Sequence, residues 1–151
     1  MSSANETKLS ILLVEDDAND IELTRRAFER NRLANMFLVA RDGAEALEML
    51  FGTSGDWPHP VLSDLQLILL DLNLPKVSGL EVLRQIRADD RTKLIPVVVL
   101  TSSDEERDVM ESYGLGANSY VRKPIGFDQF VEAVRELGLY WLVLNKTVRR
   151  D

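Results

Sequence analysis

Short apolar runs alternate along the chain with segments in which apolar residues recur at helical spacing. The runs that indicate strands are 10–14, 36–39, 66–71, 96–101 and 118–121. A helical pattern follows each of them, and the last begins at Phe127. Strict alternation of this kind is typical of a parallel sheet flanked by helices. We therefore predict a doubly wound α/β fold with five parallel strands, five helices and right-handed crossovers.

Residue types at the boundaries support this division. The run 66–71 carries apolar residues on both strand faces, as a central parallel strand does. Asp42 is predicted to cap the helix that follows it, and Ser78 to begin the next helix. Segment 52–64 contains two glycines and two prolines, which predicts a loop.

Composition limits the possible functions. The 151 residues, 45% of them hydrophobic, suffice for one compact domain with one core. There is no cysteine, so a disulfide framework, a thiolate metal site and cysteine catalysis are excluded. The formal net charge of -7 argues against binding to nucleic acid. Because no run approaches the roughly 18 apolar residues of a membrane span and no signal-peptide core is present, we expect a cytoplasmic protein without membrane contact.

Polar side chains stand at the ends of four predicted strands. Glu15 and Asp16 follow the first strand, Asp71 ends the third, Thr101 ends the fourth and Lys123 follows the fifth. Because ligands of open parallel sheets bind beyond the carboxyl ends of the strands, we expect these side chains to share one edge. Each residue alone has an ordinary explanation, such as helix capping. Their joint placement favours a site.

Clustered carboxylates repel one another unless a cation lies among them. Sites with few protein oxygen ligands suit Mg²⁺, which keeps several waters and bridges to phosphate. An aspartate carboxylate can also act as a nucleophile toward phosphorus and form an aspartyl phosphate. A metal ion and a lysine then offset charge on the phosphoryl oxygens. Aspartate, Mg²⁺ and lysine are therefore the parts that phosphoryl transfer needs.

Four motifs occur in the order ILLVEDD, LILLDLNLPKVSG, VVVLTSS and ANSYVRKP. In sequence and in spacing they resemble the receiver domains of bacterial response regulators, over roughly residues 9 to 137. The resemblance implies a flavodoxin-like topology with strand order 2-1-3-4-5 and Mg²⁺ as cofactor. It also implies a signalling protein, not an enzyme, that accepts a phosphoryl group from a sensor histidine kinase.

The resemblance assigns roles to single residues. Asp71 matches the phosphoacceptor, and Thr101 and Lys123 match the residues that contact phosphoryl oxygens. Tyr120 matches the aromatic switch residue that turns inward when the threonine moves, although an ordinary surface aromatic is the alternative. Pro124 matches a proline that follows a cis peptide bond.

The same comparison of motifs gives the metal ligands. Asp16 would bind Mg²⁺ directly beside Asp71, Glu15 through water, and Asn73 through its backbone carbonyl. Asp17 lies one residue beyond the acidic pair and is interpreted as a helix cap.

Two features resemble the stand-alone regulators of phytochrome-type histidine kinases: the long loop 52–64 and the apolar segment 138–144. We divide the chain into a flexible N-terminus (1–8), a receiver domain (9–137) and a C-terminal extension with its tail (138–151), without an output domain. One helix face cannot bury its own apolar stripe and residues 139–144 together. We therefore expect a homodimer through the last helix and 138–144, the alternative being an extension that folds back on its own domain.

Other functions stay open at this point. A phosphorelay shuttle or a docking module would share the same fold. A phosphatase with an aspartate nucleophile would need an acid at the position of Asn73. A flavodoxin-like cofactor carrier would need a loop rich in serine and threonine where Glu15 and Asp16 stand. His59 is interpreted as an exposed loop residue.

Overall fold

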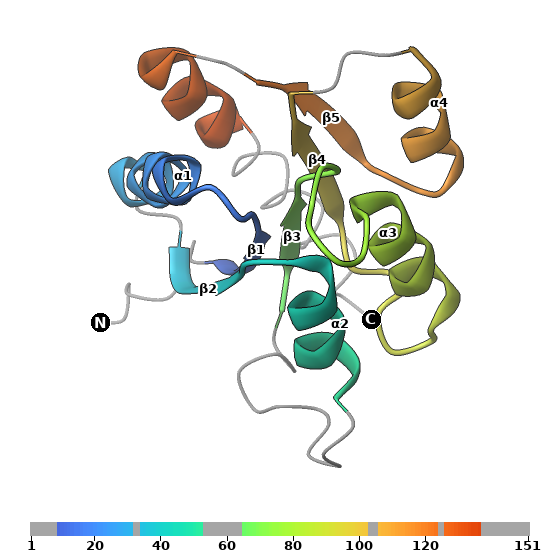
Figure 1. Cartoon of the computed structure of the whole chain (residues 1–151). Coiled ribbons are helices and arrows are strands. Elements are labelled where there is room, and N and C mark those ends of the chain that lie inside the picture. The colour runs from blue at the N-terminus through green and yellow to red at the C-terminus, as the bar shows by residue number, and fades with distance from the viewer. Residues whose placement is uncertain (1–8, 32–33, 53–64, 103–105, 124–125, 137–151) are drawn as a thin grey trace, which may run out of the picture.

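The computed structural model describes residues 9–31, 34–52, 65–102, 106–123 and 126–136 (Figure 1). The elements follow in the order β1 (Leu9–Val14), α1 (Ala18–Arg30), β2 (Ala34–Ala40), α2 (Gly43–Phe51), β3 (Leu67–Leu70), α3 (Gly79–Ala88), β4 (Val97–Thr101), α4 (Glu106–Gly114) and β5 (Ser119–Arg122). Residues 127–136 form a further helix, which we call the C-terminal helix. The alternation of strands and helices is the one that the sequence predicts.

The strands form one parallel sheet in the order β2-β1-β3-β4-β5, which confirms the predicted doubly wound topology. β3 is the central strand, and all four of its residues are buried. Val14 pairs with Leu70, and Leu70 pairs with Val99. The carboxyl ends of β1, β3 and β4 therefore lie side by side at one edge of the sheet.

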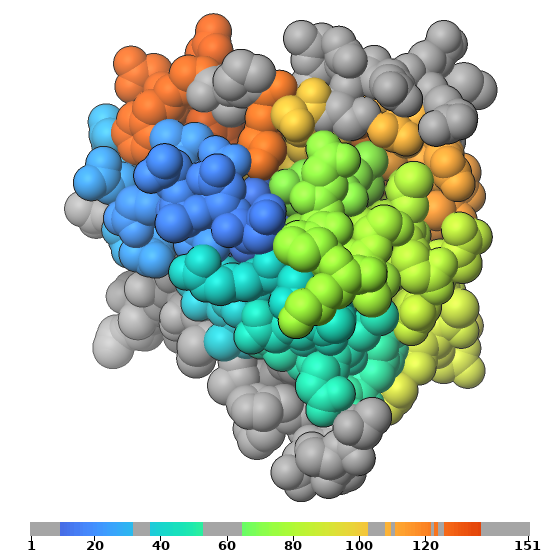
Figure 2. Space-filling model, in the orientation of Figure 1, coloured from blue at the N-terminus to red at the C-terminus, as the bar shows by residue number. Residues whose placement is uncertain are grey.

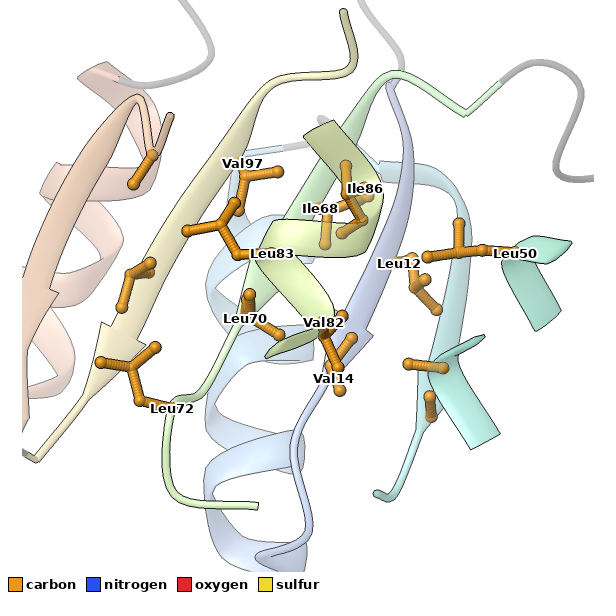
Figure 3. Packing of buried hydrophobic residues seen from close by; sticks show 14 of the residues in the cluster. Leu12, Val14, Leu50, Ile68, Leu70, Leu72, Val82, Leu83, Ile86 and Val97 are labelled. Carbon is orange, nitrogen blue, oxygen red and sulfur yellow. The ribbon is translucent and has the colours of Figure 1, made fainter. Parts of the chain in front are cut away.

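Helices cover both faces of the sheet, and each face has its own core. Helices α2 and α3 cover one face, where Figure 3 shows strand and helix side chains in contact, among them Leu12, Val14, Leu50, Ile68, Leu70, Leu72, Val82, Leu83, Ile86 and Val97. Helix α1 and the C-terminal helix cover the other face, with Ile11, Leu13, Ile21, Ala27, Phe28, Leu67, Leu69, Val98, Leu100, Phe130 and Val134. Each fully buried large apolar side chain contributes roughly 1.5–3 kcal/mol.

Three helices begin at residues whose side chains accept hydrogen bonds from backbone N–H groups of the first turn. Asp17 caps α1, Asp42 caps α2 and Ser78 caps α3. The prediction for Asp42, the start at Ser78 and the interpretation of Asp17 are confirmed. Such a cap stabilises a helix by about 1 kcal/mol, and it also fixes the direction in which the first turn leaves the strand end.

Element boundaries differ from the apolar runs by one or two residues. β2 begins at Ala34, two residues before its apolar run, because backbone pairing with β1 extends the strand beyond the side chains that reveal it. β3 ends at Leu70, but the N–H of Asp71 still donates to the carbonyl of Val14 at 3.0 Å. Among the described residues, α4 runs from Glu106 to Gly114.

Several predictions fall outside the described residues. They concern the N-terminus 1–8, most of the loop 52–64 with His59, the peptide bond before Pro124, and the dimer segment 138–144. Among the helices that the structure describes, none combines the length and the apolar character needed to span a bilayer.

Arg87 connects three segments at the amino-terminal edge of the sheet. Its guanidinium donates to the carbonyl oxygens of Gly116 at 2.8 and 3.0 Å, Ile95 at 2.7 Å and Lys93 at 3.2 Å. It also donates to the Oδ1 of Asn118 at 3.0 Å. Partial burial lowers the pKa of Arg87, but guanidinium groups keep their charge in proteins. The side chain therefore supplies donors to carbonyls that no strand or helix satisfies.

We expect Arg87→Leu to lower the free energy of unfolding by about 2–4 kcal/mol, because several backbone carbonyls lose their donor. The matched control is Arg84→Leu on the same helix, where an exposed guanidinium pairs with Glu81 at 3.1 Å. An exposed ion pair of this kind is worth at most about 1 kcal/mol. Urea denaturation followed by circular dichroism measures both, and equal effects would contradict the role of Arg87.

Candidate functional site

Acidic and basic side chains from three strand ends gather at the carboxyl edge of the sheet. Glu15 and Asp16 follow β1, and Asp71 follows β3; carboxylate oxygens of these three residues lie within 4.8 Å of one another. Lys123 follows β5, and its Nζ lies 2.9 Å from Glu15 Oε1 and 3.6 Å from Asp71 Oδ2. In Figure 2, the blue region of α1 and the green segment that leads into α3 meet near the centre of the visible face.

Asp71 is held firmly at the end of the central strand. Asp71 is only 5% exposed, and its backbone N–H donates to the carbonyl of Val14, which continues the pairing of β3 with β1. The Oδ1 atom accepts a bond from the N–H of Asn73 at 3.1 Å. One carboxylate oxygen is thus oriented by backbone, while Oδ2 lies toward Lys123. A carboxylate that is fixed but still reachable by solvent suits a nucleophile.

Glu15 is the most deeply buried acid of the site, with 1% exposure. Its Oε1 accepts from Lys123, and its Oε2 accepts from the N–H of Asp17 at 3.3 Å. Burial, and after it the charge of Asp71, raises the pKa of Glu15 to about 7, although hydrogen bonding and charge from Lys123 act in the opposite direction. The raised pKa reflects mainly the cost of burying a charge and secondly the repulsion from Asp71, and a bound cation would offset both.

Lys123 is largely buried among carboxylates. Its Nζ donates to Asp20 Oδ2 at 2.7 Å and to Glu15 Oε1 at 2.9 Å. Burial disfavours the ammonium charge, but these two hydrogen bonds and the charge of Asp71 outweigh it and raise the pKa of Lys123. The ammonium group is therefore protonated at every pH at which the protein would function.

The remaining predicted residues lie around this cluster. Thr101 is fully buried at the end of β4, and Asn73 Nδ2 donates to its Oγ1 at 3.4 Å. Asn73 thereby contacts both Asp71 and Thr101. Tyr120 pairs with Val99 in the sheet and packs, partly buried, against the core beneath α2 and α3. The structure thus brings Asn73 and Thr101 to the cluster, and it places Tyr120 two positions before the end of β5.

Gly79 lets the start of α3 lie directly against the strand end that carries Asp71. A Cβ atom on Gly79 would stand 2.2 Å from the backbone oxygen of Asp71 and 2.6 Å from the Cα of Leu72. The N–H of Gly79 donates to the carbonyl of Leu72 at 3.0 Å. The position of the Asp71 backbone therefore depends on the absence of a side chain at residue 79.

Asp20 is a site residue that the sequence patterns did not single out. It lies in the first turn of α1, four residues after Asp16, and makes the shortest contact of Lys123. Its place in the first turn of the helix that directly follows the acidic pair is the signal that could have identified it.

The sequence model of the response regulator receiver domain matches residues 11–135. This chain belongs to the response regulator receiver domain family. The predicted family and its fold are thereby confirmed. Among related proteins, the probable methanogenesis regulatory protein FilR2 of Methanothrix harundinacea is 41% identical over 143 residues, which cover 94% of this chain and 89% of that protein. Response regulator Rcp1 of Synechocystis is 38% identical over 144 residues, which cover 94% of this chain and 95% of that protein.

Solved receiver structures share the fold over most of the chain. The phosphorylated cyanobacterial phytochrome response regulator RcpA superimposes with a TM-score of 0.79 at 39% identity, covering 89% of this chain and 94% of RcpA. The Mn(2+)-bound form of response regulator Rcp1 gives a TM-score of 0.77 at 37% identity, with coverages of 89% and 94%. The expected likeness to phytochrome response regulators is therefore present in this receiver domain.

The donor set of this receiver domain fits a divalent cation. Three carboxylates with neighbouring oxygens face one edge, and hard cations such as Mg²⁺ prefer oxygen ligands. Asp16 is exposed, whereas Glu15 and Asp71 are buried, so the cluster is open to solvent on one side. An open side suits an ion that keeps several of its waters.

Proposed function

We propose that the protein is a phosphoryl-accepting switch, in which Asp71 takes a phosphoryl group from a sensor histidine kinase in the presence of Mg²⁺. The observation that carries the proposal is the position of the Asp71 carboxylate beside both the acidic pair and the Lys123 ammonium. Membership of the receiver family supports it. Asn73 stands where an aspartate-dependent phosphatase would need a proton donor, and an amide cannot supply one.

In the proposed reaction, an Asp71 carboxylate oxygen attacks phosphorus and forms a new P–O bond. The bond between phosphorus and the donor breaks, and the donor leaves with its electron pair. Lys123 and Thr101 would contact oxygens of the transferred group, the former by charge and the latter by its hydroxyl. Lys123 is already protonated, so its contribution needs no proton movement.

Mg²⁺ would be held by Asp16 and Asp71 directly, by Glu15 through water and by the backbone carbonyl of Asn73. When bound, the ion supplies positive charge that offsets the phosphoryl oxygens. The fit rests on three carboxylates whose oxygens lie within 4.8 Å. That a solved relative is the Mn(2+)-bound form of Rcp1 supports the binding of a divalent ion.

Phosphorylation would then change the surface formed by α4, β5 and the C-terminal helix. We propose that Thr101 moves toward the phosphoryl group and that Tyr120 follows it, as a shift between two populations of the same fold. Thr101 and Tyr120 lie on adjacent strands, which supports a connection between them. The changed surface would bind a downstream protein or, through 138–144, a second copy of the chain.

We further propose that the kinase is of the phytochrome type. RcpA is a phytochrome response regulator, and it covers 89% of this chain at 39% identity. Incubation with a panel of phosphorylated histidine kinases tests this: transfer should be fastest from a phytochrome-type kinase. A role as a phosphorelay shuttle would appear in the same experiment as onward transfer to a second histidine.

The basic experiment uses a small phosphodonor. Intact mass spectrometry after incubation with acetyl phosphate and Mg²⁺ should show one added phosphoryl group, and chelation of the metal should prevent the addition. A protein that stays unmodified with both this donor and the kinases would contradict the proposal.

Asp16→Asn is expected to weaken Mg²⁺ binding by about tenfold or more, since even partners outside the ligand shell typically cost 10–100-fold. Calorimetric titration measures the affinity. Glu22→Gln is the matched control. It also removes one negative charge, but from a residue on α1 that pairs with Arg25 and Arg26. Unchanged affinity in Asp16→Asn would exclude Asp16 as a ligand.

A further inference from the structure

The Lys123 ammonium group has three N–H donors, and two of them are already used. Asp20 Oδ2 accepts one at 2.7 Å, and Glu15 Oε1 accepts another at 2.9 Å. Asp71 Oδ2 lies 3.6 Å away, which is beyond hydrogen-bond distance. The third N–H donor of Lys123 therefore makes no direct hydrogen bond to Asp71, the carboxylate nearest to it on that side.

Hydrogen bonds made by its backbone N–H and carbonyl groups fix the position of Asp20. Asp17 caps α1 and accepts a bond from the N–H of Asp20 at 3.0 Å. The carbonyl of Asp20 accepts from the hydroxyl of Thr24 at 2.8 Å, and Thr24 is buried. Two contacts one turn apart thus set the position of residue 20, and its side chain is about one third exposed. Asp20 is therefore placed to hold Lys123, not merely to be near it.

The backbone of Lys123 is also fixed. Its backbone N–H donates to the carbonyl of Thr101 at 2.7 Å, which continues the hydrogen-bonded pairing of β4 and β5. The side chain then extends toward the first turn of α1, where Asp20 and Glu15 accept its two bonds. A flexible lysine is in this way held at both its backbone and its ammonium group.

We propose that Asp20 is a positioning residue for phosphoryl transfer: it holds the Lys123 ammonium off the Asp71 carboxylate and leaves one N–H donor for a phosphoryl oxygen. The inference rests on the proposed phosphorylation of Asp71. It adds a second acidic partner, on a different element, to the lysine of the site.

The physical reason lies in what Lys123 does without Asp20. With the Asp20 carboxylate removed, the ammonium keeps its bond to Glu15 Oε1 at 2.9 Å and is free to close the 3.6 Å gap to Asp71 Oδ2. A direct ion pair with Asp71 engages the attacking oxygen and lowers its reactivity. Without Asp20, the Lys123 side chain also adopts more conformations, and this freedom must be lost when the transition state forms. A misplaced catalytic group slows a reaction steeply.

The test is the rate of phosphorylation by acetyl phosphate at saturating Mg²⁺ for four proteins: wild type, Asp20→Ala, Lys123→Met and the double variant. We expect Asp20→Ala to be about tenfold slower, which is less than the ~10²–10³-fold loss typical when a transition-state contact is removed. In the double variant, loss of Asp20 should have no further effect, because it acts through Lys123. Asp20→Glu should recover part of the rate.

Glu22→Ala is the control, because it removes a carboxylate from the same helix at a residue that pairs with Arg25 and Arg26. Its rate should equal that of wild type. If Asp20→Ala fails to fold in a thermal melt, Asp20→Asn replaces it with the same expectation of a slower rate and the same non-additivity.

The outcomes separate the two proposals. A wild type that accepts no phosphoryl group overturns the proposed function and this inference with it. A phosphorylated wild type with an equally fast Asp20→Ala, or with losses that multiply in the double variant, overturns the positioning role alone.

Discussion

Asp71→Asn is expected to abolish phosphorylation by acetyl phosphate and by any kinase that phosphorylates the wild type. The amide has nearly the shape of the carboxylate but is no nucleophile toward phosphorus, so the chemical step is lost while the strand end keeps its contacts. The backbone bond from Asn73 can still reach the side-chain oxygen at position 71. Intact mass spectrometry should show only the unmodified mass.

The control is Asp90→Asn, which removes a carboxylate that is 91% exposed in the loop after α3. Its labelling should match that of wild type. A thermal melt without Mg²⁺ excludes unfolding as the cause, since Asp71→Asn removes one of several repelling charges and should melt no lower than wild type. Full labelling of Asp71→Asn would falsify the assignment of the phosphoacceptor.

Gly79→Ala is expected to lower the free energy of unfolding by about 2–3 kcal/mol, in the upper part of the range for overpacked sites. The added Cβ would stand 2.2 Å from the backbone oxygen of Asp71, so backbone on one side must move. Because the atoms that must move belong to Asp71, phosphorylation should also slow, by up to about 10²-fold for a displacement near 1 Å. Denaturant titration and the acetyl phosphate assay measure the two effects.

Gly114→Ala is the matched control for this substitution. Gly114 ends α4, and a Cβ there would meet nothing within 4 Å. Alanine at such a position should leave stability unchanged or slightly increased, because it restricts the unfolded chain. If both variants behave alike, the close approach at Gly79 does not position Asp71.

The fold was open to prediction because its signals are local and repeated. Each strand is an apolar run, each helix carries an inward stripe, and Asp42 and Ser78 mark helix starts by their residue type alone. The site followed from topology: in a parallel sheet, the residues after β1, β3 and β5 must meet at one edge. Thus Asp71 and Lys123 could be placed together although they are far apart in sequence.

Other features depend on side chains whose direction no local pattern reveals. The four acceptors of Arg87 lie in loops, and nothing in the α3 stripe distinguishes Arg87 from Arg84. The contact at Gly79 requires the distance between two backbones. The role of Asp20 became evident only from the side chain of Lys123, which follows β5 and reaches the first turn of α1.

Three carboxyl groups surround the Lys123 ammonium, and Asp16 adds a fourth negative charge beside two of them, so the stability of the receiver domain depends on its ionic surroundings. Folding brings Asp71 and Lys123 to the local group of Glu15, Asp16 and Asp20, so the complete arrangement exists only in the folded chain. A divalent ion that binds this arrangement and not the unfolded chain stabilises folding by about 2.7 kcal/mol at a hundredfold excess over its Kd. Resistance to heat and to proteases would then rise and fall with free divalent ion, through thermodynamic linkage and before any signal arrives.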